Sequence, residues 1–280
     1  MASFDQAEGL RRMLANPKPR VFTFLSALKE DEKSGMLVNL GVTLARQGSE
    51  VLMIDARASD NSIGAWLNAS NDRTLLDVAR QQRTMKEAIK MVAAGLSVTM
   101  LTRQASLTSA LPPESARQLT EVFDVVANQA DLVMVDGDIN ANDAFALASL
   151  DDSELVIQVS ADPHMIKAAY GLIKRVSNRV GRRGYGILVS GASEKEARLI
   201  YTNMAQAASR YLAVPLHYVG HVPEDEHVRK AAHLGRSVID AFPKARASLA
   251  FSKLAEQLAM TARSTLCLEG VPELGVGLGI

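Results

Sequence analysis

Short apolar runs alternate along the chain with segments whose apolar residues recur every three or four positions, and this alternation limits the possible folds more than any other feature. The runs are typical of buried strands and the intervening segments of amphipathic helices. The expected strands are Val21–Ser26, Val51–Asp55, Leu96–Leu101, Leu132–Asp136, Leu155–Ser160, Gly186–Ser190 and Leu216–Val222. The expected helices are Met36–Gln47, Pro113–Gln129, Met165–Val180, Lys195–Tyr211 and Val228–Leu234. Because strands that alternate with helices need crossover connections, we expect a doubly wound α/β fold with a mainly parallel sheet and helices on both faces.

No linker rich in proline, glycine or serine divides the chain, so we expect one α/β domain over residues 20–264. Residues 1–19 precede it as a short helix, Phe4–Ala15, and a proline-containing linker, and residues 265–280 follow as a flexible or docked tail. The 31 basic residues balance the 31 acidic ones, which gives no strong signal for nucleic acid or membrane. With one cysteine and no apolar run near the roughly 18 residues of a membrane span, we expect a cytoplasmic protein.

The loop between the first expected strand and the first expected helix is the place where a doubly wound sheet holds phosphate, because a helix N-terminus presents unpaired N–H groups. Here the loop reads SALKEDEKSG, in register with the pattern G-x-x-x-x-G-K-[ST]. That register puts Lys33 at the terminal phosphates and Ser34 at Mg²⁺. However, Ala27 and Glu32 replace both glycines, and three successive carboxylates stand where backbone amides would wrap a polyanion. The alternative is an exposed lysine followed by a serine that caps the helix.

Two aspartates end apolar runs at the expected carboxyl edge of the sheet, Asp55 after the second run and Asp136 after the fourth. Acidic residues at this edge can hold a magnesium ion or a water molecule, although each can equally cap the turn that follows its strand. We therefore take Lys33, Ser34, Asp55 and Asp136 as candidate nucleotide-binding residues. Ser34 and Asp136 would be the metal ligands if a nucleotide binds.

Four segments carry a resemblance to a known family. They read VNLGVTLARQGSEVLMIDA, DLVMVDGD, ADPHMIKAAYGLIKRV and YLAVPLHYVGHVPEDEHVRKAAHLGRSVIDAFPKARAS. With them the sequence resembles the MinD/ParA class of deviant P-loop ATPases and, within it, the flagellar number regulators called FlhG or FleN. The resemblance covers nearly the whole chain and implies the P-loop NTPase fold.

The N-terminal segment FDQAEGLR is similar to the D-Q-A-x-x-L-R motif with which FlhG proteins stimulate the GTPase FlhF. The resemblance assigns Gln6 to the GTP site of that partner, with Asp5 beside it, and Leu10 and Arg11 to the docking side. Such an amide can orient an attacking water, and an arginine can pair with phosphate. The partner-binding residues implied are Asp5, Gln6, Ala7, Leu10 and Arg11. The alternative is an amphipathic helix whose apolar residues pack on the body of the protein.

The departures from the family are concentrated in its nucleotide chemistry. Leu28 stands where the family has the lysine that crosses an ATP-sandwich dimer, and Arg57 stands where it has the carboxylate that positions the hydrolytic water. Ser190 replaces the asparagine that recognises adenine, and Asn140 replaces a glycine after the Walker B strand. We therefore expect a degenerate Walker A site on a retained fold, with no catalytic residue and no cofactor.

The resemblance, taken with these departures, implies a regulator of flagellar placement or number, not an enzyme, that acts as a pseudo-ATPase scaffold and activates an FlhF-type GTPase. One alternative is a working ATPase that uses ATP and Mg²⁺ through an atypical phosphate loop and forms ATP-dependent dimers. Another is an anti-activator or scaffold for flagellar transcription or another polar cargo, with switch or transcription-regulator proteins as partners. A partner would also account for recruitment to the cell pole or inner membrane.

Overall fold

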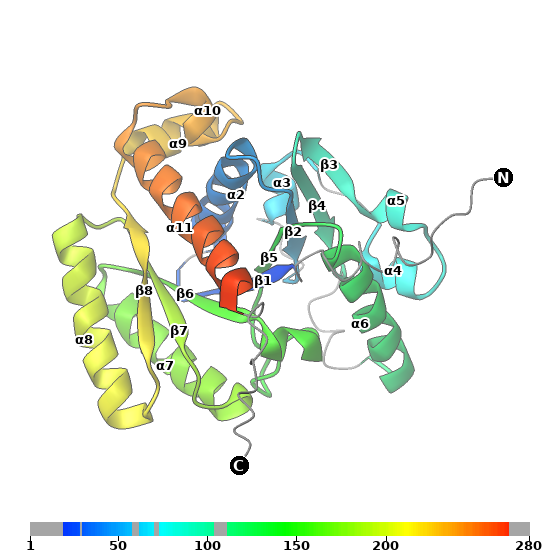
Figure 1. The fold of residues 1–280 in the computed structure, drawn as a ribbon, viewed down its shortest axis with the longest axis horizontal. Helices are drawn as coiled ribbons and strands as arrows, with labels where there is room; N and C mark the ends of the chain where they lie inside the picture. The colour runs from blue at the N-terminus through cyan, green and yellow to red at the C-terminus, as the bar shows by residue number, and fades with distance from the viewer. Residues whose placement is uncertain (1–18, 29, 58–61, 70–72, 104–110, 269–280) are drawn as a thin grey trace, which may run out of the picture.

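A computed structural model describes residues 19–28, 30–57, 62–69, 73–103 and 111–268, and these ranges hold one eight-stranded sheet with the order β3-β4-β2-β5-β1-β6-β7-β8 (Figure 1). All neighbouring strands run parallel except the pair β3 and β4. The strands are β1 (Arg20–Ser26), β2 (Val51–Asp55), β3 (Lys90–Ala93), β4 (Leu96–Met100), β5 (Leu132–Asp136), β6 (Glu154–Ser160), β7 (Tyr185–Ser190) and β8 (Leu216–Val222). This topology confirms the predicted doubly wound, mainly parallel fold.

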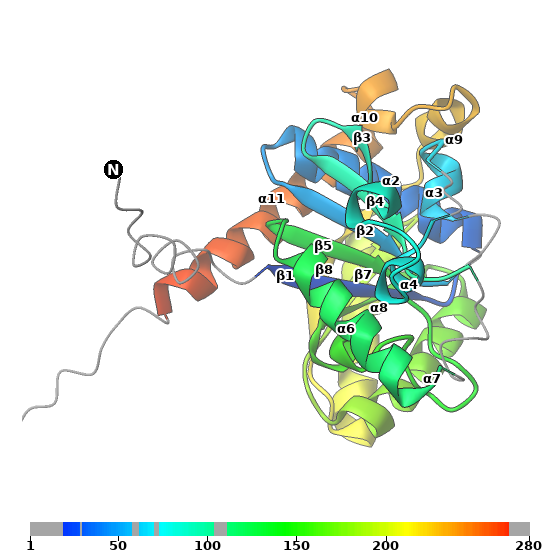
Figure 2. The same cartoon turned by 90° about the vertical axis from the view of Figure 1, so that its right-hand side faces the viewer.

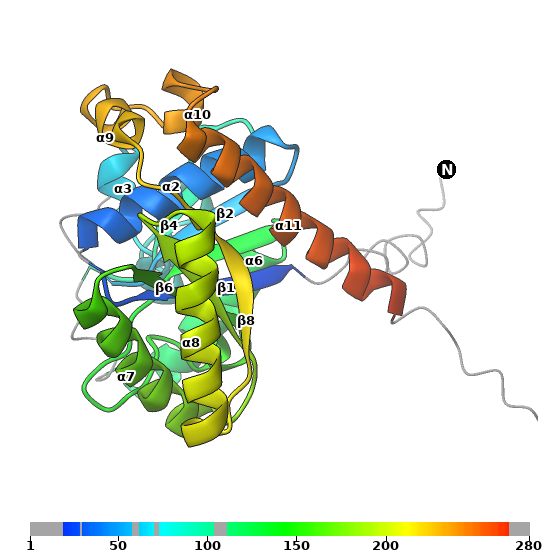
Figure 3. The ribbon, with the colours of Figure 1, turned by 90° about the vertical axis from the view of Figure 1, so that its left-hand side faces the viewer.

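Helices cover both faces of the sheet (Figures 2 and 3). The long helices are α2 (Glu30–Arg46), α6 (Pro113–Ala127), α7 (Pro163–Val180), α8 (Glu194–Leu212) and α11 (Arg246–Leu268). The short ones are α3 (Ile63–Trp66), α4 (Leu75–Ala79), α5 (Met85–Ala88), α9 (Glu226–His233), α10 (Val238–Ala241) and the 3₁₀ helix Ala148–Asp152. One core cluster joins α6, α7 and α8 to the sheet, and a second joins α2 and α11 to its other face. Neighbouring strand residues point to opposite clusters, as Phe24 and Leu25 of β1 do.

The sequence pattern did not predict β3 or most of the short helices. The strand β3 has no apolar run because it lies at the edge of the sheet, where Met91 is 76% exposed. Helices of four or five residues, such as α3 and α4, are too short to show a helical period. The long central strands, in contrast, were predicted to within one residue.

The start of α2 differs from the prediction, α11 passes the predicted end of the domain, and the other predicted helices agree to within two residues. Helix α2 begins at Glu30, six residues before the expected start at Met36, because the charged residues 30–33 show no apolar period. Helix α11 continues to Leu268, four residues past the boundary drawn at 264, because neither glycine nor proline interrupts the chain before Gly270. The C-terminal end of α11 projects beyond the sheet (Figures 2 and 3).

Within the described ranges, no helix has the length and apolar character needed to cross a membrane. The apolar stripe of α11 instead packs on the protein, since Phe251, Leu254 and Leu258 are all buried. Two glycines allow this face of the molecule to pack closely. A Cβ on Gly220, which has a φ of +148°, would lie 2.3 Å from the Leu254 side chain, and one on Gly41 would lie 2.6 Å from Met53 Sδ.

Candidate functional site

The four candidate nucleotide-binding residues come together at the carboxyl edge of the central strands. Asp55 ends β2, Asp136 ends β5, and the two are directly paired in the register of these strands. Lys33 and Ser34 reach the same place from the first turns of α2, which follows β1 on the other side of β5. All four residues are buried, with exposed fractions of 0–2%. Their roles toward a nucleotide remain a prediction, but their proximity is a property of the fold.

The amine of Lys33 is held by protein groups. Its Nζ lies 2.6 Å from Oδ1 of Asp136 and donates a hydrogen bond to the carbonyl oxygen of Gly137 at 2.5 Å. Burial lowers the pKa of Lys33, and the nearby Arg57 lowers it further, while Asp136 acts in the opposite direction. The lysine that would meet a phosphate is therefore turned into the protein and paired there.

Arg57 completes the centre in a way that sequence reasoning missed. Its Nε lies 2.9 Å from Oδ1 of Asp136, and its Nη2 donates to Oγ of Ser34 at 3.2 Å. Its backbone N–H donates to Oδ1 of Asp55 at 3.0 Å. The sequence showed only that a carboxylate of the family was lost at this position. The structure shows that the replacing guanidinium contacts both residues predicted to hold magnesium.

The phosphate loop itself is short. Because α2 begins at Glu30, only residues 27–29 separate it from β1. The N–H groups of Ser34 and Gly35 therefore fall within the hydrogen-bonded part of the helix, where they cannot wrap a phosphate. The sequence at this helix start, EDE, also adds negative charge, which disfavours a polyanion there.

These residues do not fit a magnesium–nucleotide complex. A divalent ion between Ser34 and Asp136 would meet the guanidinium of Arg57, which carries the same sign of charge and already contacts both groups. The positive charges of Lys33 and Arg57 also balance the negative charges of Asp55 and Asp136. We therefore derive no hydrolytic step from this centre.

Two of the other departures, Ser190 and Asn140, make local hydrogen bonds through their side chains. Oγ of Ser190 accepts from Nε2 of Gln158 at 3.1 Å. The side chain of Asn140 accepts backbone N–H groups two and four residues further on, which fixes a turn after β5.

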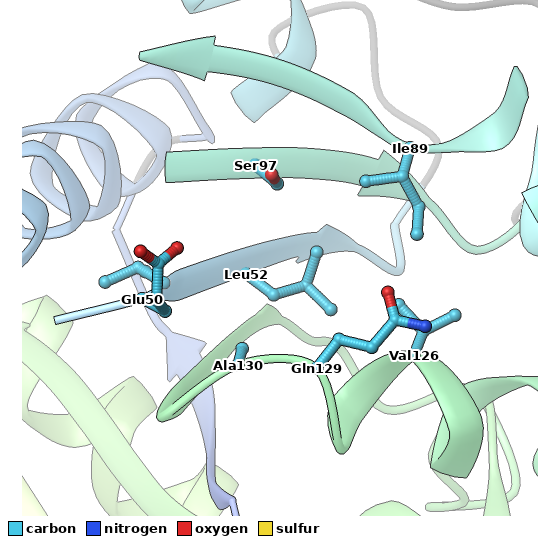
Figure 4. A pocket seen from close by; sticks show the side chains of 8 residues that line it. Glu50, Leu52, Ile89, Ser97, Val126, Gln129 and Ala130 are labelled. Carbon is cyan, nitrogen blue, oxygen red and sulfur yellow. The ribbon is translucent and has the colours of Figure 1, made fainter. Parts of the chain in front are cut away.

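A cavity of about 80 Å³ lies elsewhere, at the amino ends of β2 and β4 (Figure 4). Leu52, Ile89 and Val126 give it apolar walls, and the Gln129 amide and the Glu50 carboxylate lie at its rim. Its other lining residues are Val51, Ser97 and Ala130. Since Asp55 ends β2 at the opposite edge of the sheet, this cavity is separate from the centre around Asp136.

The candidate partner-binding residues Asp5, Gln6, Ala7, Leu10 and Arg11 lie outside the described residues. The first strand residue after this segment, Arg20, forms an ion pair with Glu154 and donates to the carbonyl oxygen of Leu258 at 3.0 Å. The chain therefore enters the sheet beside α11.

Comparison with known proteins supports the resemblance. No family model matches the chain. It is 29% identical over 227 residues to the antiactivator FleN of Pseudomonas aeruginosa. The aligned region covers 81% of each of the two chains. Among solved structures, the septum site-determining protein MinD of Pyrococcus horikoshii, complexed with Mg-ADP, matches with a TM-score of 0.64 and 19% identity over 87% of this chain and 97% of MinD. A ParA family ATPase of Chlorobium tepidum matches with a TM-score of 0.64 and 17% identity over 85% and 98% of the two chains.

The structural likeness, at less than 20% identity, establishes the fold, and the similarity to FleN extends the relation to the sequence. The chain therefore has the fold of the MinD and ParA proteins and is similar in sequence, over most of its length, to the antiactivator FleN.

Proposed function

We propose that the protein is a FlhG-like regulator of flagellar number or placement that works by binding other proteins and does not cycle ATP. The single observation that supports the proposed loss of ATP cycling is the pairing of both Lys33 and Arg57 with the buried Asp136. Because lysine and arginine already neutralise the buried carboxylates, a magnesium–nucleotide complex would add little electrostatic stabilisation at this site. The flagellar role is supported by the similarity to FleN.

The partner proposed is an FlhF-type GTPase, which the N-terminal D-Q-A-x-x-L-R segment would stimulate. This part of the proposal is supported by the sequence of residues 4–11 and by the relation to FleN. A second role is an anti-activator of flagellar transcription, which the name of FleN favours. The two roles are compatible, because one would use the N-terminal segment and the other the α/β domain.

Replacing Gln6 with Ala is expected to reduce stimulation of the partner GTPase at least about tenfold, because the amide that orients the attacking water is lost. The measurement is the GTP hydrolysis rate of the purified partner with increasing amounts of each variant. Gln206→Ala, at an exposed position on α8, is the matched control and should stimulate like the wild type. Equal stimulation by the Gln6→Ala variant would rule out this role of the segment.

A further inference from the structure

We propose that Arg57 is a resident cation in the place of a divalent metal ion, and that its removal opens a divalent-cation site formed by Ser34, Asp136 and Asp55. This inference rests on the proposed function, because both depend on the pairing of Lys33 and Arg57 with Asp136. It adds that Arg57 is the group that excludes a metal ion.

The positions of two oxygen atoms, one on Ser34 and one on Asp136, suit the ligands of one metal ion. Oγ of Ser34 and Oδ2 of Asp136 are 3.5 Å apart, a separation that suits two ligands of one ion with metal–oxygen distances of about 2.1–2.5 Å. A hydroxyl and a carboxylate are the hard oxygen ligands that Mg²⁺, Mn²⁺ and Ca²⁺ prefer. The guanidinium of Arg57 contacts both residues, at 3.2 Å and 2.9 Å. It therefore bridges the same two residues that one ion would bridge.

The charges of the centre also favour a cation once Arg57 is removed. Lys33 and Arg57 together neutralise Asp55 and Asp136, and all four groups are buried or nearly so, the Arg57 side chain being 9% exposed. Among the described residues, removing Arg57 takes one positive charge from a centre that holds Asp55 and Asp136 and has Asp138 nearby. An excess negative charge in a buried site is costly, so it favours uptake of a cation from solvent. Oδ1 of Asp55 accepts the backbone N–H of residue 57, a bond that any non-proline residue at this position can donate, so a substitution of Arg57 keeps it.

The chain contains its own spectroscopic reporter for this position. Its single tryptophan, Trp66, packs on the start of α2, where a Cβ on Gly35 would lie 3.0 Å from two ring atoms. Gly35 directly follows the proposed ligand Ser34. An oxygen-bound Tb³⁺ ion at the site would therefore lie close enough to be excited through the indole ring.

The test is a titration of the full-length protein with Tb³⁺, followed by tryptophan-excited terbium luminescence, and with Mn²⁺, followed by the thermal unfolding temperature. We expect Arg57→Ala and Arg57→Ser to bind Tb³⁺ at least tenfold more tightly than the wild type and to gain thermal stability with Mn²⁺. Arg57→Lys keeps a cation and should behave like the wild type. Arg103→Ala, which removes another arginine paired with an aspartate, is the matched control and should also show no gain.

A second substitution identifies the ligand, since Asp136→Asn combined with Arg57→Ala should abolish the new binding. Folding is checked by circular dichroism, and a variant that folds only when Mn²⁺ is added would also support the inference. Equal Tb³⁺ binding by the wild type, no binding by folded Arg57→Ala and Arg57→Ser, or binding that survives Asp136→Asn would overturn it. GTPase stimulation and ATP binding by the wild type are measured in separate experiments, so failure here is distinguishable from failure of the proposed function.

Discussion

Replacing Asp136 with Asn is expected to lower the free energy of unfolding by about 3–5 kcal/mol, the largest effect of any single substitution at the candidate site. The Asp136 carboxylate is fully buried and is the shared partner of Lys33 and Arg57. An amide of the same shape leaves two buried cations without this countercharge, so that Lys33 must be deprotonated or hydrated and Arg57, which stays charged, must be hydrated. Chemical denaturation of both proteins measures the difference.

The matched control is Asp143→Asn, because Asp143 forms an ion pair of the same length, 2.6 Å, with Arg175 at an exposed position. This surface pair is expected to contribute less than about 1 kcal/mol. If the cost of Asp136→Asn comes from uncompensated cations, adding Lys33→Met should recover part of it, so that the two substitutions are not additive. A cost below about 1 kcal/mol for Asp136→Asn would mean that the centre does not depend on this carboxylate.

Replacing Phe251 with Ala is expected to cost about 3–5 kcal/mol of stability, because it leaves a cavity between α11 and the sheet. Phe251 is 1% exposed and belongs to the core cluster that α11 shares with α2. This prediction treats α11 as part of the core, in contrast to a lipid-binding helix whose apolar residues face solvent.

Leu249→Ala on the same helix is the control, since Leu249 is 56% exposed and its loss should change stability by less than about 0.5 kcal/mol. Thermal or urea unfolding of the three proteins gives the comparison. A similar small change for both variants would show that α11 is not packed on the sheet in solution.

The sequence predicted the parts of this fold that depend on local pattern. The strands β2 and β5 are fully buried apolar runs, so the apolar pattern alone was enough to place their ends and the two terminal aspartates. The early start of α2 was missed because the charged residues 30–33 have no place in an apolar period.

The role of Arg57 could not be predicted for a different reason. Its contacts with Ser34 and Asp136 join residues 23 and 79 positions apart along the chain. They depend on the register of β2 against β5 and on the orientation of one long side chain. The sequence shows such a residue only as a departure from a pattern. That the guanidinium of Arg57 takes the place of a metal ion becomes apparent only when Ser34 and Asp136 are placed beside it.

Calorimetric titration of the wild-type protein with Mg·ATP tests the central claim most directly, with Lys33→Ala as the control. Because Lys33 and Arg57 already neutralise the centre, we predict no saturable heat at millimolar ATP for either protein. Saturable binding by the wild type that Lys33→Ala loses would contradict the claim. It would show that the short loop and α2 rearrange to hold a triphosphate, and that the protein is an ATP-dependent switch.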